Sequence, residues 1–460
     1  MHAQDLRTAL ERLEAAGDLL RVAAPLSWEY ELAAVLWRLR DGPAVRFENV
    51  TGYRTPVVGN LLNDRRKLAT ALGIERTALQ ARVSRALREP IEPALAAEGP
   101  CLAVAYDPAV ALTDHFPVPL LSEFDAGRYL SAGVLICRDP ESGRRNAAIC
   151  RLQVTGPGTL GAYLAPTHSR AFLDVHRERG RPMEVAVALG LHPAIVVASQ
   201  FLTPLDETLV AGGMFREPLL LTRARTVDLE VPAFAEILLE GLIDPREEQP
   251  EGPFGEFPGT YAPRRPNPVI RLTAVSSRPD PLFQMIVAGR HPEHLVTGAI
   301  AREAGLYEAI RSVVPGVRAV HLTEGGTCRF HAVISIRKRS AGEGKRAIMR
   351  AFSEQDLLKH VVVVDEDIDV TDPADVEWAV ATRMRAHEDV VIVPGMKSNP
   401  VDPMSVDRTI SKLGIDATLP LDARAAARHR VDVPAAVAAA IEGRWEEITG
   451  AQNQPTGGKR

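Results

Sequence analysis

Residues 132–154 read AGVLICRDPESGRRNAAICRLQV, and this stretch decides the class of fold. It contains two short apolar runs separated by a polar segment, as in two neighbouring strands of a sheet. Similar short runs, several bounded by glycine or proline, recur between residues 110 and 290, at 183–190, 194–200, 218–223, 268–276 and 282–289. We therefore expect this region to form a barrel-like, largely antiparallel sheet.

Helical and strand patterns alternate on either side of this region. Before it, helical periodicity covers residues 6–20 with Gly17 as a C-cap, and strand patterns at 44–50 and 55–62 precede a helix that ends at Gly73. After it come a long helical period and alternating strand and helix patterns, at 292–314, 319–324, 328–336, 344–354, 360–367 and 434–448. This alternation predicts a second α/β domain.

The order of the patterns predicts an α/β (α+β) fold. The expected parts, in chain order, are an α/β segment (1–110) and a split β-barrel (111–290) of one N-terminal domain (1–290), a linker helix (291–315), a C-terminal α/β domain (316–450) and a flexible tail (451–460).

The composition is that of a globular chain with more than one buried core. Of 460 residues, 46% are hydrophobic and 25% are charged, which excludes a disordered or fibrous protein. A net charge of −5 and an aromatic content of 5% give no general attraction to nucleic acid or to an anionic membrane. No stretch reaches roughly 18 apolar residues, and the four cysteines form no CxxC pair. We expect a cytoplasmic protein with reduced thiols and with neither a membrane nor a nucleic-acid partner.

Three short motifs resemble known sites but lack the required context. Residues 156–161 fit GxGxxG, yet the chain then runs into Pro166 rather than opening a helix, so we expect a hairpin turn. The segment AGEGKR at 341–346 lacks the spacing and the Ser or Thr of a Walker loop. The segment HPEH at 291–294 lacks the HExxH order of a zincin and gives little support to a metal site.

Two other segments are better candidates for a site. In EGPFGE at 251–256, glycine and proline must turn the chain sharply, so that the backbone holds the carboxylates of Glu251 and Glu256. A solvated acidic turn is the alternative, but the rigid framing favours a site. In NAAICR at 146–151, Arg151 follows an apolar strand and must be paired or bound to an anion, because burying it alone is costly.

His168 and Glu217 follow Asn146 along the chain. Asn, His and Glu together supply oxygen and nitrogen ligands that suit Mn²⁺ or Mg²⁺ better than a metal that prefers thiolates. Each of these residues is, by itself, more often structural than functional, and their spacing alone does not decide between the two.

Taken together, these motifs resemble the UbiD family of prenylated-FMN-dependent decarboxylases. The resemblance runs from the first helix to residue 417, and its most specific parts are N-x4-R followed by LQVTGPGTLG, EGPFGEFPGTY, KHVVVVDEDID from Lys359 and SKLGIDAT from Ser411. It implies that the N-terminal domain binds prenylated FMN through its split barrel and that the C-terminal domain mediates oligomers.

The resemblance also implies roles for the candidate residues. Those that match the family's catalytic Glu-Arg-Glu network are Arg151, Glu251 and Glu256. Those that look like ligands of a divalent metal, usually Mn²⁺, on the flavin phosphate are Asn146, His168 and Glu217.

A potassium ion is implied nearby, held by Glu217 and by the backbone carbonyls of Ala198 and Phe201. Lys359 matches a lysine that supports the cofactor phosphate, with Lys412 as the alternative. The residues implied to contact the cofactor are Asn146, Ile149, Arg151, Thr167, His168, Ser199, Phe201, Glu217 and Lys359.

The implied reaction is the reversible, non-oxidative decarboxylation of an aromatic, heteroaromatic or α,β-unsaturated acid through a covalent adduct with the flavin. Loss of CO₂ leaves two electrons on carbon that no side chain accepts, so a cofactor is needed. Arg151 would orient the substrate carboxylate, Glu256 would protonate the carbon, and Glu251 would hold Arg151 and support cofactor maturation. The implied partners are the acid, CO₂, a flavin prenyltransferase that supplies the cofactor, and further copies of the chain in a homodimer or homohexamer.

Two other functions are open at this point. One is a metal-dependent hydrolase that uses the same Asn, His and Glu with a bound water and needs no flavin. The other is a non-catalytic UbiD-like subunit, against which the presence of the whole Glu-Arg-Glu set argues. Thr167, where some relatives carry glutamine, and the small pair Ala147–Ala148 leave the acid undefined. The physiological direction and the divalent metal are equally open.

Overall fold

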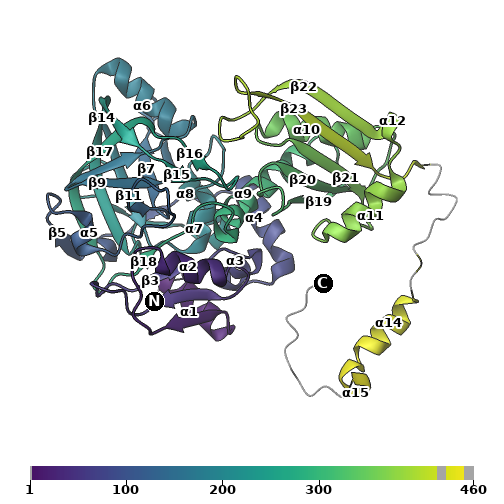
Figure 1. Cartoon of the computed structure of the whole chain (residues 1–460), viewed down its shortest axis with the longest axis horizontal. Coiled ribbons are helices and arrows are strands. Elements are labelled where there is room, and N and C mark those ends of the chain that lie inside the picture. Colours follow the sequence, from purple (N-terminus) through teal and green to yellow (C-terminus); the bar gives the residue numbers. More distant parts are fainter. Residues whose placement is uncertain (1–2, 422–430, 432, 450–460) are drawn as a thin grey trace.

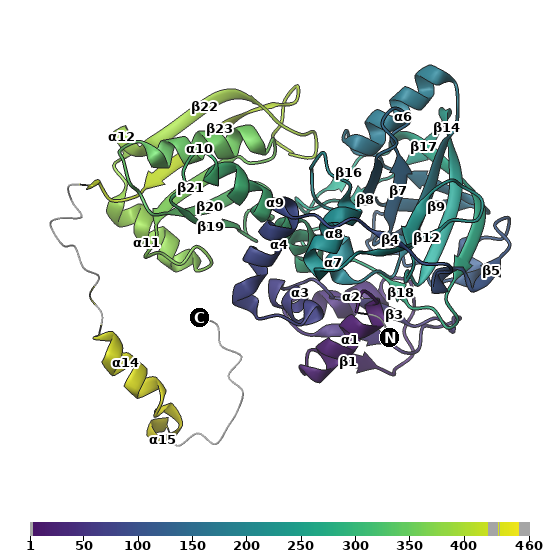
Figure 2. The same cartoon turned by 180° about the vertical axis from the view of Figure 1, so that it is seen from behind.

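The computed structural model describes residues 3–421, 431 and 433–449. Two lobes lie side by side, and helix α9 (Pro292–Arg311) runs between them in Figures 1 and 2. The larger lobe holds the N-terminal segment and an extended sheet, and the smaller lobe holds a five-stranded sheet. This mixture of helices and sheets confirms the predicted α/β (α+β) class. The expected flexible tail at 451–460 lies outside the described residues.

The N-terminal segment is a small α/β unit at the bottom of the larger lobe in Figure 1. Its elements are α1 (Leu6–Ala15), β1 (Leu19–Val22), α2 (Glu31–Arg38), β2 (Ala44–Phe47), β3 (Val57–Gly59), α3 (Arg65–Leu72), η1 (Arg76–Ala78) and α4 (Leu79–Arg88). Helix α1 begins where the Asp5 carboxylate accepts the N–H of Arg7. It ends at Ala15 with Ala16 as the C-cap, one residue before the expected Gly17, whose φ of 70° favours glycine. Strands β1, β2 and β3 form a four-stranded sheet with β18 (Phe283–Gln284).

The main sheet of the larger lobe has nine strands in the order β6-β9-β10-β17-β14-β11-β7-β8, with β5 added on β17. The strands are β5 (Val104–Tyr106), β6 (Tyr129–Leu130), β7 (Val134–Arg138), β8 (Arg145–Ile149), β9 (Leu152–Gly156), β10 (Thr159–Ala162), β11 (Met183–Leu189), β14 (Ile237–Glu251) and β17 (Arg265–Ser277). Every pairing in this sheet is antiparallel, as the sequence predicts. Side chains from strands far apart in this order pack in one core, among them Leu135, Leu152, Val187, Leu239 and Ile270.

Smaller elements surround this sheet. The strands are β4 (Ala94–Leu95), β12 (Leu220–Arg223), β13 (Glu230–Pro232), β15 (Phe254–Gly255) and β16 (Tyr261–Ala262). The helices are η2 (Pro100–Leu102), α5 (Leu112–His115), α6 (His168–Arg179), α7 (Pro193–Ala198) and α8 (Glu207–Phe215). The GxGxxG motif forms the turn between β9 and β10, which confirms the predicted hairpin.

The strand expected at 194–200 is wrong, because this run forms helix α7. Pro193 occupies the first turn of the helix, and the side chain of His192 accepts the N–H of Ala194. All six residues of α7 are buried. A run that is apolar on every side carries no periodicity, so it cannot be told from a buried strand by its pattern.

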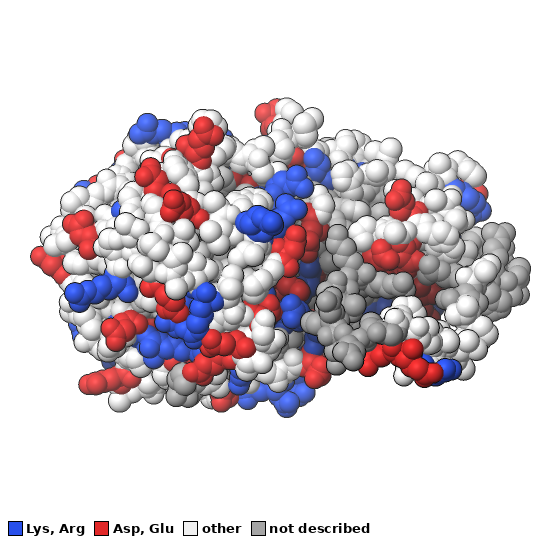
Figure 3. Space-filling model, turned by 60° about the horizontal axis from the view of Figure 1, so that its bottom comes forward, with Lys and Arg blue, Asp and Glu red and all other residues white. Residues whose placement is uncertain are grey.

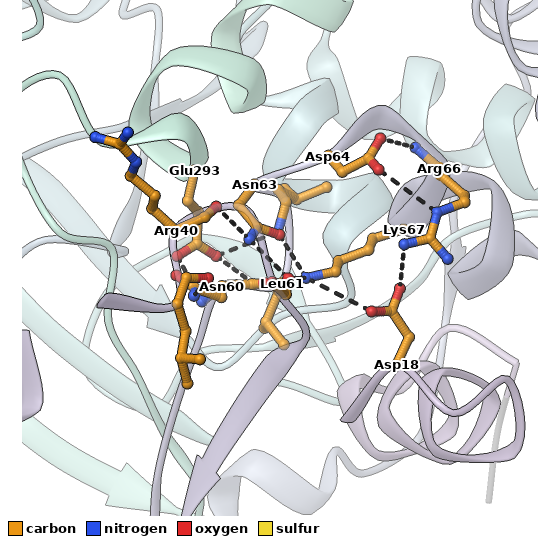
Figure 4. A network of polar contacts seen from close by, with 12 residues as sticks. Asp18, Arg40, Asn60, Leu61, Asn63, Asp64, Arg66, Lys67 and Glu293 are labelled. Carbon is orange, nitrogen blue, oxygen red and sulfur yellow. Dashed lines mark hydrogen bonds and ion pairs between the residues drawn. The ribbon is translucent and has the colours of Figure 1, made fainter. Parts of the chain in front are cut away.

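Helix α9 is fixed to the N-terminal segment by the buried carboxylate of Glu293 (Figure 4). This carboxylate accepts the backbone N–H groups of Asn60 at 2.7 Å and Leu61 at 2.6 Å. In the same network, the Lys67 ammonium donates to the backbone oxygen of Asn60 and to the side chain of Asn63. The loop after β3 therefore positions the start of the helix that joins the lobes.

The smaller lobe has a mixed sheet in the order β19-β20-β21-β23-β22. Its elements are β19 (Val317–Leu322), β20 (His331–Ile336), α10 (Glu343–Glu354), β21 (His360–Asp365), α11 (Pro373–Arg383), α12 (Ala386–Asp389), β22 (Val390–Lys397) and β23 (Thr409–Ala417). The last helix, expected at 434–448, is divided at Gly443 into α14 (Ala435–Glu442) and α15 (Trp445–Thr449).

Charges of both signs are interspersed on the face shown in Figure 3. Among the described residues, no helix has both the length and the apolar character needed to cross a membrane.

Candidate active site

A cavity of about 580 Å³ lies between the two lobes. The barrel, helix α9 and the smaller lobe all contribute to its wall, which includes Arg151, Tyr163, Phe254, Glu256, Thr297, Arg302, Arg329 and Lys397. Another cavity, of about 780 Å³, lies beside α1 and β5 and contains none of the candidate residues. The cavity between the lobes is therefore the one to consider as a site.

Arg151, between β8 and β9, joins the two glutamates of the EGPFGE segment. Its Nε donates to Oε1 of Glu251 at 3.1 Å and its Nη2 donates to Oε2 at 3.2 Å, which is the bidentate geometry of a strong ion pair. Its Nη1 donates to Glu256. The carboxylates lie 100 and 105 residues further along the chain, so the fold brings the predicted set together.

The two carboxylates differ in how firmly they are held. Glu251, at the end of β14, is fully buried, and it also accepts hydrogen bonds from the Tyr129 hydroxyl at 3.2 Å and from Asn267 Nδ2 at 3.0 Å. Glu256 follows β15, lines the cavity and keeps 13% of its side chain exposed. Glu251 is thus a fixed partner of Arg151, and Glu256 has room to face a ligand.

The loop between these glutamates is shaped by its glycines and proline. Gly252 adopts a φ of 87° before the cis peptide bond to Pro253, and the N–H of Gly255 donates to Asp125 at 2.9 Å. The ring of Phe254 and the ring of Tyr163 lie close to the Arg151 guanidinium carbon, with centroid distances of 5.1 and 4.2 Å. The arginine therefore has two aromatic rings in contact distance of its guanidinium group.

Burial and charge set the protonation of this group. Burial raises the pKa of Glu256, although Arg151 opposes the shift. Burial lowers the pKa of Arg151, but Glu256 and Glu251 more than offset it and the net shift is upward. The guanidinium therefore stays charged. Glu256 is the carboxyl that can carry a proton closer to neutral pH, as a general acid requires.

Asn146 and His168 meet beside this region. Oδ1 of Asn146 lies 3.1 Å from Nδ1 of His168, and Nδ2 of Asn146 donates to Ser169 at 2.9 Å, which orients the amide oxygen towards the imidazole. Burial lowers the pKa of His168, which favours the neutral ring that a metal binds. These two predicted ligands are brought together.

The structure does not bring Glu217 to this pair. Its carboxylate accepts from Gln4 at 3.1 Å, and it follows the C-terminal end of α8. The carboxylate beside Asn146 is that of Glu207, at the first position of the same helix, which accepts the backbone N–H of Ala147 at 2.8 Å. The correction has a simple geometric cause. Glu207 is the first of the nine residues of α8, a helix about 13 Å long, and Glu217 lies two residues beyond its other end.

Glu207 was missed because its sequence context has a common structural explanation. An acidic residue directly after the N-cap Asp206 is usual at a helix start. In the structure Glu207 is buried, and burial raises its pKa to about 8. Among the described residues it forms no salt bridge, so a cation is the natural partner of this carboxylate. Asn146, His168 and Glu207 thus fit a divalent metal, although no group of three His, Cys, Asp or Glu side chains in the described chain does.

The remaining cofactor candidates divide into two groups. Ile149 and Thr167 line the cavity between the lobes. Ser199 and Phe201 are buried after α7 and lie outside its lining, where the Ser199 hydroxyl donates to the backbone of Val196.

Neither candidate lysine lines this cavity. Lys359 is ion-paired with Asp402 at 3.2 Å. Lys412 is buried in the smaller lobe, with its ammonium donating to the backbone oxygens of Gln355 and Asp356, and burial lowers its pKa to about 8. The basic residues of the smaller lobe that line the cavity are Arg329, Lys397 and Arg408.

Comparison with known proteins identifies the family. The N-terminal, Rift-related and C-terminal domain models of the 3-octaprenyl-4-hydroxybenzoate carboxy-lyase family, named UbiD_N, UbiD and UbiD_C, match residues 10–87, 94–291 and 295–417. The chain belongs to the UbiD family and is a carboxy-lyase. This result removes the support for the metal-dependent hydrolase and for the non-catalytic subunit.

Similar proteins point the same way. The anhydromevalonate phosphate decarboxylase of Methanothermobacter thermautotrophicus is 38% identical over 88% of this chain and 95% of its own length. The decarboxylase of the same name from Methanosarcina mazei is 36% identical, over 90% and 95%. The UbiD-class enzyme HmfF from Pelotomaculum thermopropionicum, solved in complex with FMN, has a TM-score of 0.89 and 43% identity over 93% of this chain and 97% of its own. An evolved dimeric form of HmfF in complex with prFMN has a TM-score of 0.86 and 41% identity, over 94% and 98%.

Proposed function

We propose that the protein is a reversible, non-oxidative decarboxylase that depends on prenylated FMN and acts on an aromatic, heteroaromatic or α,β-unsaturated carboxylic acid. The observation that carries this proposal is the buried Glu251–Arg151–Glu256 group at the wall of the cavity between the lobes. The flavin complexes of the similar HmfF structures support the choice of cofactor. The relatives named for anhydromevalonate phosphate make a phosphorylated acid one candidate substrate.

Asn146, His168 and Glu207 would hold Mn²⁺ or Mg²⁺ against the flavin phosphate. The donor set of one amide, one imidazole and one carboxylate suits such a metal, and a cation would compensate the buried carboxylate of Glu207. The carbonyl oxygens of Ala198, at the end of α7, and of Phe201, in the turn that follows, are candidates for the accompanying K⁺. When bound, prenylated FMN supplies the electron sink that the side chains lack.

The protein groups then have separate tasks. Arg151 donates two hydrogen bonds to the Glu251 carboxylate, so it presents a fixed guanidinium to the substrate carboxylate. Glu256, with its raised pKa, delivers a proton to the carbon from which CO₂ has left. The cavity lies between the lobes, and a substrate that displaces water from it would strengthen the electrostatic contacts inside it.

The test is to produce the protein together with a flavin prenyltransferase, to record its absorption spectrum and to assay acids for CO₂ release. A flavin spectrum with release of CO₂ from at least one unsaturated or aromatic acid is expected, while protein made without the prenyltransferase should be inactive. Turnover by flavin-free protein would contradict the proposal. Light scattering on the holoprotein would distinguish a homodimer from a homohexamer.

A further inference from the structure

Two arginines on the cavity wall form no salt bridge among the described residues. Arg302 comes from α9, and Arg329, which is only 5% exposed, comes from the connection between β19 and β20. Arg302 donates from Nη1 to the oxygens of Gly298 and Gln200, at 3.0 and 3.5 Å. Its buried Nε has no hydrogen-bond partner within the described part of the chain. Arg329 donates from Nη1 to the backbone oxygens of Leu295 and Cys328.

The two guanidinium groups lie next to each other across Gly298. A Cβ at this position would lie 2.6 Å from Nη1 of Arg302 and would collide with Nη2 of Arg329. A side chain at residue 298 would therefore displace at least one of the two guanidinium groups from its position. Two cations placed this closely repel each other unless an anion lies between or beside them.

The carboxylates in the neighbourhood are already paired. Glu256 is bound to Arg151, and Glu303 is bound to Arg65 at 2.6 Å. In the described part of the chain, neither Arg302 nor Arg329 takes part in a salt bridge. Other buried arginines have one, as Arg383 does with Asp365 at 2.9 Å. Burial lowers the pKa of Arg302, and the nearby charge of Arg329 lowers it further. Burial also lowers the pKa of Arg329, although the more distant carboxylates of Glu256 and Glu303 partly oppose this shift.

Neighbouring groups on the wall do not supply the missing charge. His294 is also in the lining, and burial together with the nearby Arg329 lowers its pKa to about 3, so the ring is neutral. Asp356 is paired with Lys397 at 2.8 Å, and Glu354 is paired with Arg350 at 2.9 Å. The wall formed by α9 and the smaller lobe therefore presents a net positive charge to the cavity.

We propose that Arg302 and Arg329 bind a second anionic group of the substrate, so that the enzyme acts on acids that carry a carboxylate or a phosphate ester in addition to the carboxylate that leaves. This inference rests on the proposed function. The leaving carboxylate belongs at Arg151 on the barrel wall, and the flavin phosphate belongs with Asn146, His168 and Glu207, which are not in the cavity lining. Arg302 and Arg329, on the wall formed by α9 and the smaller lobe, are thus available to bind the anionic group at the end of the substrate opposite the leaving carboxylate.

The test compares acids that share one skeleton and differ in the second charge. Pent-2-enoic acid is the monoanion, hex-2-enedioic acid adds a carboxylate, and 5-(phosphonooxy)pent-2-enoic acid adds a phosphate ester. Cinnamic and 4-carboxycinnamic acids form an aromatic pair. Holoenzyme is assayed for binding by calorimetry and for CO₂ release, each expressed as the ratio of dianion to monoanion. We expect a ratio of at least about tenfold for one class of dianion, because charge-assisted hydrogen bonds are the strong ones, and the class with the higher ratio identifies the second group.

Variants show whether the arginines cause the preference. Arg302→Gln and Arg329→Gln should each reduce the ratio about tenfold or more, Arg329→Lys should restore part of it, and Gly298→Ala should reduce it by displacing the pair. Arg311→Gln, on the exposed end of the same helix, is the matched control and should keep the ratio. Flavin and metal content are measured in every variant.

Three results would overturn the inference. They are equal treatment of monoanions and dianions by the wild type, an equal loss for both in the arginine variants, and loss of flavin in those variants, which would assign the arginines to the cofactor. The failure of the proposed function is distinguishable. A dianion preference in binding that depends on Arg302 and Arg329, without release of CO₂ from any acid, would reject the decarboxylase assignment and keep the anion site.

Discussion

At the scale of single residues, Glu251 and Glu256 are five positions apart and have different surroundings. Glu251 is fully buried and bound by Arg151, Tyr129 and Asn267, whereas Glu256 faces the cavity with a raised pKa. A fixed, fully bonded carboxylate suits an orienting role. A carboxyl with a raised pKa at the cavity suits proton delivery.

We therefore predict that Glu256→Gln binds the cofactor normally and lowers turnover by about 10²–10⁴-fold, since the amide has no carboxyl proton to donate. It should also block deuterium uptake from solvent into the product. In the wild type, turnover should fall as pH rises past the raised pKa of Glu256, because the proton is then lost. Glu251→Gln, the comparison variant, should instead reduce cofactor maturation and substrate binding. Near-normal turnover and exchange in Glu256→Gln would show that another group is the acid.

Glu207, at the start of α8, and Glu217, just beyond its end, give a second comparison. Glu207→Gln should lose bound metal together with flavin, because the buried carboxylate beside Asn146 no longer supplies a negative charge. Glu217→Gln should retain both, since its carboxylate contacts Gln4 instead. Metal analysis and mass spectrometry of the purified holoproteins measure the two contents. Loss of metal and flavin in Glu217→Gln, with both retained in Glu207→Gln, would identify Glu217 as the metal ligand.

At the scale of elements, the sequence predicts structure well where a pattern is local. Alternation of apolar residues predicts the hairpin of β7 and β8. Glycine and proline within a few residues predict the end of α1 close to Gly17 and the sharp EGPFGE loop. It predicts poorly where no local pattern exists, as for the wholly buried α7. The choice between Glu207 and Glu217 depends on which end of α8 faces β8. The proximity of Arg302 and Arg329 depends on how the two lobes pack against each other. Such long-range contacts leave no spacing signal.

The start of α9 carries a prediction at the same scale. Burial raises the pKa of Glu293 to about 7, despite the backbone N–H groups that it accepts. Because its folded-state pKa lies above the unfolded value near 4.5, ionisation of Glu293 costs stability progressively as pH rises from about 4.5 to 7. The difference in free energy of unfolding between the wild type and Glu293→Gln should therefore shift against the wild type over this range. Urea unfolding of both proteins at several pH values measures it, and a constant difference would contradict the assignment.

At the scale of the whole molecule, Glu303 connects three parts of the chain. From α9, its carboxylate binds Arg65 of the N-terminal segment at 2.6 Å and accepts the N–H of Leu322 at 2.8 Å, and it lies 3.3 Å from Nδ1 of His321 in the smaller lobe. Burial raises the pKa of Glu303, but Arg65 and His321 more than offset it and bring it to about 2. The ionised carboxylate thus stabilises the folded state above pH about 4.5, and this contribution is lost as pH falls towards 2.

We predict that Glu303→Gln lowers the free energy of unfolding by about 3–5 kcal/mol at neutral pH, because it leaves Arg65 with its principal partner neutral. The lost free energy should mainly weaken the interaction between the lobes. Calorimetry should therefore show one thermal transition in the wild type and two in the variant. Glu308→Gln, on the same helix and paired with the more exposed Arg88 and Arg311, should cost less than about 1 kcal/mol and keep one transition. If Glu303→Gln unfolds in a single transition at an unchanged temperature, the lobes are held together by the apolar contacts of α9 rather than by this carboxylate.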